Sequence, residues 1–224
     1  MCGRFTLYHS TQQVVNRFGV EEVIFEISPR YNIAPSQQVA AIVNLNGHRV
    51  LTSFKWGLVP SWAKDPAVGN RMINARAETL AEKPSFKAAL LRRRCIVPAD
   101  GFYEWIGTSG KRQPVYVHRP AGELFALAGL WEEWSDPTTG IPLKTCTIIT
   151  VPPNKFVARL HHRMAAILAP EDELRWLKNH DDINELLAML KPYTGKLESY
   201  EVSSSVNSPL YDKPECISPL RALL

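Results

Sequence analysis

The middle of this sequence is a succession of short apolar segments separated by turn residues, and this pattern constrains the fold more than any other feature. Strand-like segments cover residues 39–45, 50–58, 95–97, 102–106, 115–117, 124–131 and 146–151. Asn46-Gly47 between the first two is typical of a two-residue hairpin turn, and Ser109-Gly110 marks another tight turn. Helical patterns do not alternate regularly with these segments, so the sequence does not predict a βαβ sheet.

Helical patterns occur before, within and after the strand-rich region. Ser10 begins a Ser-x-x-Gln capping box, and Gly19 ends the helical spacing that follows it. Three more helices are expected: one capped by Ser85, one opening on the acidic run 171–173, and one over residues 183–190. Residues 31–37 resemble a turn, and late strands are expected over residues 165–168 and 201–206. The sequence therefore predicts the α+β class.

The composition is that of one ordinary globular domain. The chain has 224 residues, 45% of them hydrophobic and 21% charged, with no internal repeat and no Gly/Ser linker. Its 17 prolines are spread among the predicted loops. We therefore expect a single domain spanning residues 1–224, in the form of a monomer.

Several absences narrow the possible functions. No apolar run approaches the length of about 18 residues of a membrane span, and the first ten residues lack the apolar core of a secretion signal. The cysteines at positions 2, 95, 146 and 216 have neither the paired spacing of a zinc site nor the density of a disulfide framework. We expect no membrane association, no metal, no cofactor and a place in the reducing cytoplasm. The net charge of +4 permits an anionic partner without requiring one.

Cys2 directly follows the initiator methionine. Removal of Met1 leaves a residue with both an α-amine and a thiol, groups whose ordinary pKa values are about 7.7–8.0 and about 8.5. Such a residue can act as an N-terminal nucleophile with its own amine as base. Alternatively, the amine can attack an aldehyde to give an imine, on which the thiol closes a thiazolidine ring. A cysteine without function is the third interpretation, and Met-Cys alone does not decide among them.

Asn74 and Arg76 lie two residues apart in the segment Asn-Ala-Arg-Ala-Glu-Thr. In an extended chain their side chains project to the same side, where they can hold a sugar oxygen and a phosphate. An asparagine in a turn beside a solvated Arg–Glu surface explains the same residues.

Glu104 lies between aromatic residues of an apolar segment, Phe102-Tyr103-Glu104-Trp105. Alternation places its carboxyl either on a solvated face or in the interior. In the interior, burial raises the pKa of a carboxyl toward the value that a proton shuttle needs near neutral pH. Asp100-Gly101, just before this segment, is typical of a turn.

His161 and His162 are adjacent, so in an extended chain their rings point to opposite sides and form a poor chelating pair. Either ring is a candidate acid–base group if it faces a pocket. Trp62 lies beside turn residues and Lys64, and it is a candidate stacking platform for an unpaired base if it is exposed. The other tryptophans, Trp105, Trp131 and Trp176 among them, are assigned to packing.

Eight motifs occur in a fixed order along the chain. They are Cys2-Gly3-Arg4-Phe5, Tyr31-Asn32-Ile33-Ala34-Pro35, Trp56-Gly57-Leu58-Val59-Pro60, residues 74–79, residues 95–105, residues 147–150, His161-x-Arg163-Met164, and Val202-Ser203 with Val206-Asn207. Together, from Cys2 to about Pro209, they resemble the SRAP family, the SOS response-associated peptidases or abasic site processing proteins. The chain departs from the usual family pattern at His162 and Ala165, where Asp and Pro are more common.

The resemblance implies a mixed, barrel-like β core flanked by helices, and a protein that shields abasic sites in single-stranded DNA. Through its amine and thiol, Cys2 would form a reversible thiazolidine cross-link with the aldehyde at C1′ of the abasic sugar. The implied catalytic partners are Asn74, which orients the sugar, Glu104, which moves protons, and His161, its acid–base partner. The implied DNA contacts are Arg4, Arg76, Thr150 and Arg163 on phosphates and Trp62 beside the lesion. The family is also associated with removal of its own first residue and with strand cleavage by β-elimination.

Two other classes of function stay open at this point. One is an N-terminal-nucleophile thiol peptidase, in which Cys2 attacks an amide. The other is a non-catalytic binder of single-stranded DNA that uses only Arg and Trp side chains. The mild net charge suits a short single-strand groove at the nucleoid better than a long duplex footprint.

Overall fold

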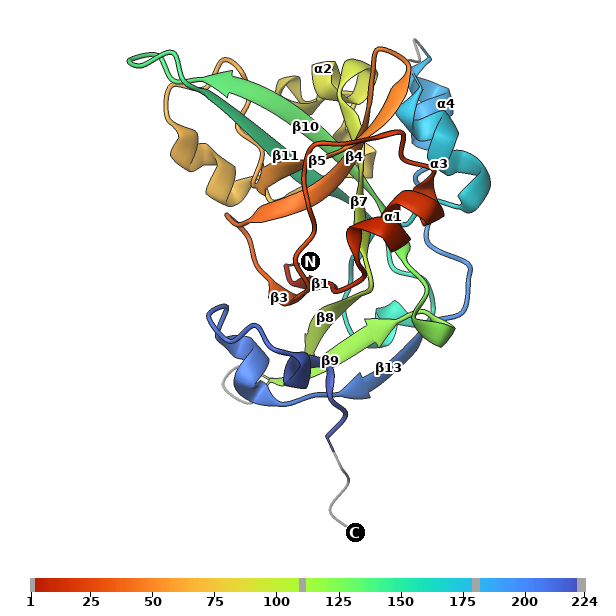
Figure 1. Cartoon of the computed structure of the whole chain (residues 1–224). Coiled ribbons are helices and arrows are strands. Elements are labelled where there is room, and N and C mark those ends of the chain that lie inside the picture. The colour runs from red at the N-terminus through yellow and green to blue at the C-terminus, as the bar shows by residue number, and fades with distance from the viewer. Residues whose placement is uncertain (1–2, 109–111, 179–181, 221–224) are drawn as a thin grey trace.

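Two β-sheets meet where β7 runs directly into β8, with a cover of helices along one side (Figure 1). The computed structural model describes residues 3–108, 112–178 and 182–220.

The strands are β1 (Phe5–Leu7), β2 (Glu22–Val23), β3 (Arg30–Ile33), β4 (Gln38–Leu45), β5 (His48–Trp56), β6 (Asn74–Arg76), β7 (Arg94–Ala99), β8 (Gly101–Ile106), β9 (Gln113–His118), β10 (Phe125–Ser135), β11 (Pro142–Val151), β12 (Met164–Ala165) and β13 (Glu198–Glu201). The α-helices are α1 (Thr11–Phe18), α2 (Pro84–Arg92), α3 (Pro170–Leu177) and α4 (Ile183–Ala188). The 3-10 helices are η1 (Pro66–Arg71), η2 (Ala77–Thr79), η3 (Pro120–Gly122), η4 (Val157–Arg159), η5 (Ser204–Asn207) and η6 (Pro214–Ile217).

Five strands close a barrel in the order β11-β10-β7-β4-β5. Neighbours in this ring are antiparallel, except that β5 and β11 pair in parallel and thereby complete it. The ring joins segments far apart in the sequence, since Cys146 lies opposite Trp56. The predicted α+β class and the mixed, barrel-like core are confirmed.

The last part of β11 continues beyond the closed ring and changes its partners. Residues Ile148, Ile149 and Thr150 pair in parallel with Asn74, Ala75 and Arg76 of β6, and Thr150 pairs on its other side with Ala165 of β12. Ala75 is buried, whereas Arg76 is exposed, as expected for side chains that alternate along a strand. The switch carries β6 and the segment before β12 to one end of the barrel.

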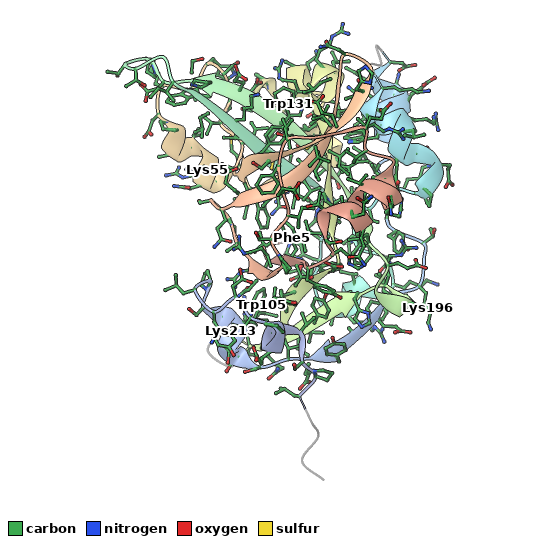
Figure 2. The ribbon with its side chains drawn as sticks, viewed as in Figure 1. Phe5, Lys55, Trp105, Trp131, Lys196 and Lys213 are labelled. Atoms are coloured by element: carbon green, nitrogen blue, oxygen red, sulfur yellow. The ribbon has the colours of Figure 1, made fainter. Side chains whose placement is uncertain are left out.

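The second sheet has the order β13-β9-β8-β1-β3 and lies below the barrel in Figure 1. All its neighbours are antiparallel, and β1 is held between β3 and β8. Phe5 of β1 connects this sheet to the barrel, because its ring packs edge-on against Trp56 with centroids 5.2 Å apart. Figure 2 shows Phe5 at the level where the two sheets meet.

The predicted local signals mostly hold. Ser10 and Gln13 form the expected capping box of α1, and Gly19 ends that helix at a φ of 60°. Asn46 and Gly47 have φ values of 53° and 92°, the left-handed pair of a type I′ hairpin turn. The acidic residues 171–173 lie in the first turn of α3, as expected.

Four expectations about elements are corrected. Ser85 does not cap α2, because Pro84, whose ring fixes a helical φ, already occupies the first turn and Lys83 is the N-cap. The turn expected over residues 31–37 is confined to 34–37, because residues 30–33 form β3 and pair with β1. The strand expected over 165–168 stops at Ala165, apart from a single bridge at Ile167. The strand expected over 201–206 ends at Glu201, and a 3-10 turn follows in which the Ser203 hydroxyl accepts the backbone N–H of Ser205. The predicted Ser109-Gly110 turn lies outside the described residues.

Candidate active site and nucleic-acid interface

The first described residues lie alongside the middle of β8. Phe5 lies opposite Phe102, and the N–H of Tyr103 donates to the carbonyl of Arg4 at 3.0 Å. Continued by one residue, this antiparallel register would bring Gly3 opposite Glu104. The predicted nucleophile Cys2 itself lies outside the described residues.

Glu104 occupies an interior position on β8. It shares a face of the strand with Phe102, whose ring packs against Phe125 in the main core, and only 4% of its surface is exposed. Burial raises the pKa of the Glu104 carboxyl to about 7. Of the two alternatives that the sequence left open for this side chain, the structure has the interior one.

His161 follows η4, and its ring is held by the backbone two residues later. Nδ1 of His161 lies 2.9 Å from the backbone nitrogen of Arg163 and 3.1 Å from its carbonyl oxygen, so it can accept from the first or donate to the second. Burial lowers the pKa of His161, and the positive charge of Arg112 acts in the same direction. Arg112 immediately precedes β9, so this charge belongs to the β8–β9 hairpin that carries Glu104.

The expectation that the two histidine rings point to opposite sides is wrong. The His161 and His162 rings stack with centroids 4.2 Å apart and planes 28° from parallel. The reason is that the chain bends after η4 instead of running extended, so alternation does not apply. Among the described residues, no group of three or more His, Cys, Asp or Glu side chains could hold a metal ion.

Asn74, Arg76 and Thr150 line one pocket of about 420 Å³. This confirms the prediction that Asn74 and Arg76 project to the same side of an extended segment. The remaining lining residues are Arg71, Met72, Lys83, Ser85 and Phe86. No local sequence pattern marks these five as site residues, although Lys83-Pro84 marks the start of a helix.

Arg163 connects the histidine segment to β11. Its Nη2 donates to the carbonyl of Thr150 at 2.7 Å, and its two Nη atoms lie 2.5 and 2.9 Å from the carboxylate oxygens of Glu78. The hydrogen bonds from Arg163 lower the pKa of Glu78. A phosphate bound by Arg163 would therefore share this guanidinium with Glu78 or replace it.

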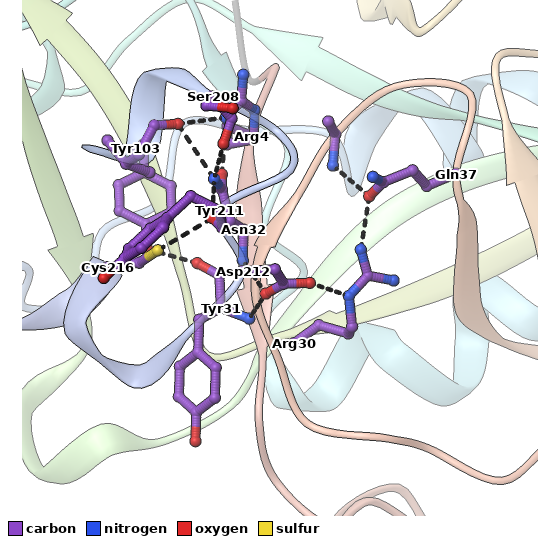
Figure 3. Close-up of polar contacts among 12 residues, drawn as sticks. Arg4, Arg30, Tyr31, Asn32, Gln37, Tyr103, Ser208, Tyr211, Asp212 and Cys216 are labelled. Atoms are coloured by element: carbon purple, nitrogen blue, oxygen red, sulfur yellow. Dashed lines mark hydrogen bonds and ion pairs between the residues drawn. The ribbon is translucent and has the colours of Figure 1, made fainter. Parts of the chain in front are cut away.

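Arg4 is held from two sides (Figure 3). Its Nη1 donates to Oδ1 of Asn32 at 2.7 Å and to the carbonyl of Val206 at 2.6 Å. The guanidinium carbon lies 5.6 Å from the ring centre of Trp105, whose Nε1 donates to Oδ1 of Asn207 at 2.7 Å. Trp105 packs at the rim of a second hydrophobic cluster around Tyr103, apart from the main core. Arg4 thus has structural partners in addition to any predicted phosphate contact.

Trp62 is 64% exposed on the loop between β5 and η1, as a stacking platform requires. The buried Trp134 holds this loop, because its Nε1 donates to the carbonyl of Ala63 at 2.7 Å. Val59 at the start of the loop donates to Oγ1 of Thr145 at 2.9 Å. The β10–β11 hairpin therefore fixes the loop that presents Trp62.

The other residues assigned to packing are buried or, in the case of Trp131, partly buried. Trp176 is fully buried and donates to the carbonyl of Cys95, and Trp131 stacks on Phe54. Cys95, Cys146 and Cys216 are buried free thiols. Within residues 3–108, 112–178 and 182–220, no helix is long and apolar enough to cross a membrane.

Comparison with known proteins agrees with this arrangement. The family model described as SOS response associated peptidase (SRAP) matches residues 1–209. The abasic site processing protein YoqW of Bacillus subtilis is 46% identical over 222 residues, which cover 97% of this chain and 99% of YoqW. The abasic site processing protein HMCES of Gallus gallus is 34% identical, over 86% of this chain and 66% of the chicken protein.

The solved structures include a close match in shape. A crystal structure of a protein from Bacteroides thetaiotaomicron superposes with a TM-score of 0.88 at 28% identity, covering 98% of this chain and all of the other. The family match over nearly the whole chain, the identity to YoqW and the shared fold lead to one conclusion. The chain belongs to the SRAP family.

Proposed function

We propose that this protein captures abasic sites in single-stranded DNA through a covalent bond to Cys2, acting as a monomer after removal of Met1. One observation carries the proposal. Phe5 of β1 lies opposite Phe102 of β8, and Arg4 accepts the N–H of Tyr103. The next residues along the two segments are Gly3 and Glu104, a buried carboxyl with a pKa of about 7. Cys2 is the residue before Gly3 in the sequence, so its Cα is about 3.8 Å from the Cα of Gly3. The names of its relatives, abasic site processing proteins, support the same substrate.

The chemistry uses both nucleophiles of an N-terminal cysteine. The α-amine adds to the C1′ aldehyde of the open-chain abasic sugar, and loss of one water gives an imine. The thiol then adds across the C=N bond: a C–S bond forms, and the proton released by sulfur ends on nitrogen. The product is a thiazolidine, and every step is reversible, so the DNA can be released without a further reactant.

Glu104, which is buried, and His161, which is half-buried, can move the protons that this reaction requires. A carboxyl with a pKa of about 7 is present in both protonation states at neutral pH, so Glu104 can assist opening of the sugar ring and addition of the thiol. Burial lowers the pKa of His161, so its imidazole is neutral near pH 7 and can accept a proton. Asn74, at the edge of the pocket between β6 and α2, orients the sugar.

Side chains around these residues would contact the DNA strand. Arg76 and Thr150 share the pocket with Asn74, and Arg163 bonds to Thr150 from the other side. Arg4 lies next to Gly3, and the exposed Trp62 can stack on an unpaired base beside the lesion. A single strand suits these groups because a stacking indole needs a base that is not already paired.

The test is a denaturing gel of the mature protein with a single-stranded oligonucleotide that carries one abasic site. A complex that survives heat and denaturant is expected, with none on the intact oligonucleotide. Cys2→Ala leaves an amine without the thiol, so it should give only an imine that requires reduction to survive. Retention of Met1 should prevent the complex, because its amine has no neighbouring thiol.

Glu104→Gln tests the proton transfer in the same assay. The rate of complex formation should fall at least tenfold, since an amide does not exchange the proton. Glu201→Gln, an exposed glutamate at the end of β13, is the matched control and should keep the wild-type rate. A thiol peptidase or a simple DNA binder would give no denaturation-resistant complex in any of these reactions, and that result would overturn the proposal.

A further inference from the structure

A second cavity, of about 720 Å³, opens beside α1, at the side of the molecule where α1 and α3 lie next to each other (Figure 1). The two helices are joined by Arg17, whose two Nη atoms donate to the Glu173 carboxylate at 2.9 and 2.6 Å. None of the described residues assigned above to catalysis or DNA contact lines this cavity. We call it the α1 pocket, and it is lined by His9, by Gln13, Asn16 and Arg17 of α1, by residues of the segment 119–124 and by Pro170.

Two amide side chains of α1 line the α1 pocket as hydrogen-bond donors. Oε1 of Gln13 accepts the backbone N–H and the hydroxyl of Ser10, at 2.9 and 3.0 Å. Oδ1 of Asn16 accepts from Nε2 of Gln12 at 2.8 Å. Because both amide oxygens are engaged along the helix, the NH2 group of each side chain is the end that can donate to a ligand. The wall formed by α1 therefore suits a ligand that is rich in acceptor oxygens.

Arg119 adds a positive charge that a ligand can reach. Its Nη1 donates to the carbonyl of Leu124 at 3.0 Å, and its Nη2 pairs with Glu123, whose side chain is 57% exposed. An ion pair with so exposed a partner contributes little to stability, so an anion in the pocket can replace Glu123 on the guanidinium. Arg17 differs, because its bidentate pair with the buried Glu173 already neutralises it. Arg119 is therefore the group that can bind an anion.

His9 lines the α1 pocket with one ring nitrogen already engaged. Its Nδ1 contacts the carboxyl of Asp100, which is fully buried and also accepts the backbone N–H groups of Tyr8 and His9. Nε2 lies on the ring edge away from Asp100, so it is the nitrogen that can reach a ligand. A carboxyl behind an imidazole fixes the orientation of the ring. His9 thus supplies one more oriented polar group.

The apolar part of the α1 pocket comes from Leu124, which is buried, and from Pro170 at the start of α3. Just before Leu124 the chain turns through Ala121, at a φ of 56°, and Gly122, at a φ of 69°. An alanine rarely adopts this left-handed conformation, and such backbone strain is concentrated at functional sites and ligand clamps. The strained turn belongs to the same wall as Arg119.

We propose that the α1 pocket binds a small organic anion, a phosphate or carboxylate attached to an apolar body. Arg119 and the amides of Gln13 and Asn16 bind the anionic group, and Leu124 and Pro170 pack against the body. The volume falls in the range of about 300–1,000 Å³ typical of sites for small organic ligands, and a bare inorganic ion would fill little of it. This site is separate from the proposed lesion site, so the inference does not rest on the proposed function.

The experiment is a titration of the nitrogen-15-labelled full chain, followed by amide proton–nitrogen correlation NMR. The probes are phenyl phosphate, benzoate and benzyl alcohol, which share a ring and differ in the attached group. At least one of the two anions should shift the amide signals of residues 9–17 and 119–124 with a Kd of about 1 mM, and the tighter one identifies the class of anion. Benzyl alcohol should not produce a saturable shift there. Saturable binding of benzyl alcohol as tight as that of the anions, or no saturable shift of these residues with either anion, would overturn the inference.

Three variants assign the binding to the named groups. Arg119→Gln should weaken the Kd of the tighter anion about tenfold, since it removes a charge-assisted hydrogen bond. Arg175→Gln is the matched control, because Arg175 forms a similar exposed pair with Asp172 on α3 outside the pocket, and it should keep the wild-type Kd. Glu123→Gln removes the competing carboxylate and should tighten binding about threefold.

The Glu123→Gln result keeps the test independent of folding, because misfolding does not produce a gain in affinity. Equal Kd values for Arg119→Gln and Arg175→Gln would overturn the inference. Weaker binding by Glu123→Gln, or shifts confined to the pocket between β6 and α2, would overturn it as well.

Discussion

Asp100 and Glu104 are buried carboxyls four residues apart, and they differ in the hydrogen bonds that they accept. Burial raises the pKa of both Asp100 and Glu104. Asp100 also accepts the backbone N–H groups of Tyr8 and His9, at 2.5 and 3.3 Å, and contacts the His9 ring. These donors favour the charged form of Asp100. Their hydrogen bonds connect the residues after β1 to the start of β8. Glu104, with a pKa of about 7, is suited to proton transfer.

Glu104→Gln should change stability in a pH-dependent way. The folded pKa of about 7 lies above the unfolded value of about 4.3, so the folded protein retains a proton that the unfolded chain has lost. Stability is therefore lost as pH rises through this window, by about 1.4 kcal/mol per pH unit relative to the glutamine variant. Urea denaturation at pH 5, 6, 7 and 8 measures the difference, and a pH-independent difference would contradict the burial of this carboxyl. Glu201→Gln should show none of this dependence.

His161 should titrate below the ordinary histidine value. Burial disfavours the imidazolium, so the ring should be neutral at pH 7. Nitrogen-15 NMR of the imidazole measures this pKa. A pKa above 6.5 would contradict the dominance of burial over the hydrogen bond with the Arg163 backbone.

At the scale of elements, β11 organises the site by changing partners along its length. Its first part closes the barrel with β5 and β10, and its last part holds β6 and β12. Asn74, Arg76, Thr150 and Arg163 meet because of that change. Its hairpin with β10 also holds the loop that presents Trp62.

Trp134→Phe should loosen the Trp62 loop without unfolding the protein. Phenylalanine fills most of the buried space but lacks the N–H that donates to Ala63, a loss of about 1 kcal/mol. Amide hydrogen exchange in residues 61–65 should become about fivefold faster, because the loop opens locally. Trp131→Phe, which keeps its stacking on Phe54, is the control and should leave this exchange unchanged. Equal exchange in both variants would show that the hydrogen bond does not hold the loop.

Whether an element or pairing could be predicted from the sequence depends on how far apart its residues lie along the chain. The Asn46-Gly47 hairpin and the capping box of α1 depend on neighbouring residues, so their patterns predicted them correctly. The parallel pairing of β5 with β11 joins residues about 90 positions apart, and no local pattern encodes it. Arg71 and Lys83, which line the same pocket as Asn74 and Arg76, were missed for the same reason: exposed cations carry no periodicity, and only the fold brings them to Asn74.

For the whole molecule, the C-terminal segment is tied to the beginning of the chain. The Asn32 side chain is fully buried; its amide contacts the carbonyls of Val206, Ser208 and Tyr211, and its Oδ1 accepts from Arg4. Asp212 accepts the N–H groups of Tyr31 and Asn32 and pairs with Arg30. These contacts, drawn in Figure 3, connect residues about 175 positions apart. The Tyr-Asn-Ile-Ala-Pro motif thus joins both ends of the described chain around β1.

Asn32→Ala should be strongly destabilising. It removes a buried amide and leaves the Arg4 guanidinium and several carbonyls without a partner, at about 1–3 kcal/mol for each unsatisfied group. We expect a loss of about 3 kcal/mol in urea denaturation and faster proteolysis within residues 203–213. Asn207→Ala removes one exposed contact, to Trp105, and should cost less than about 1 kcal/mol. Similar losses in the two variants would contradict the role of Asn32.

The central claim is that the mature N-terminal cysteine bonds covalently to an abasic sugar. Mass spectrometry under denaturing conditions, on the purified protein with and without an abasic single-stranded oligonucleotide, tests it most directly. The claim predicts a free protein lacking Met1, and one adduct whose mass is the sum of that protein and the oligonucleotide less one water. Peptide mapping should place the added mass on Cys2. An adduct on any other residue, or no adduct with protein that has lost Met1, would contradict the claim.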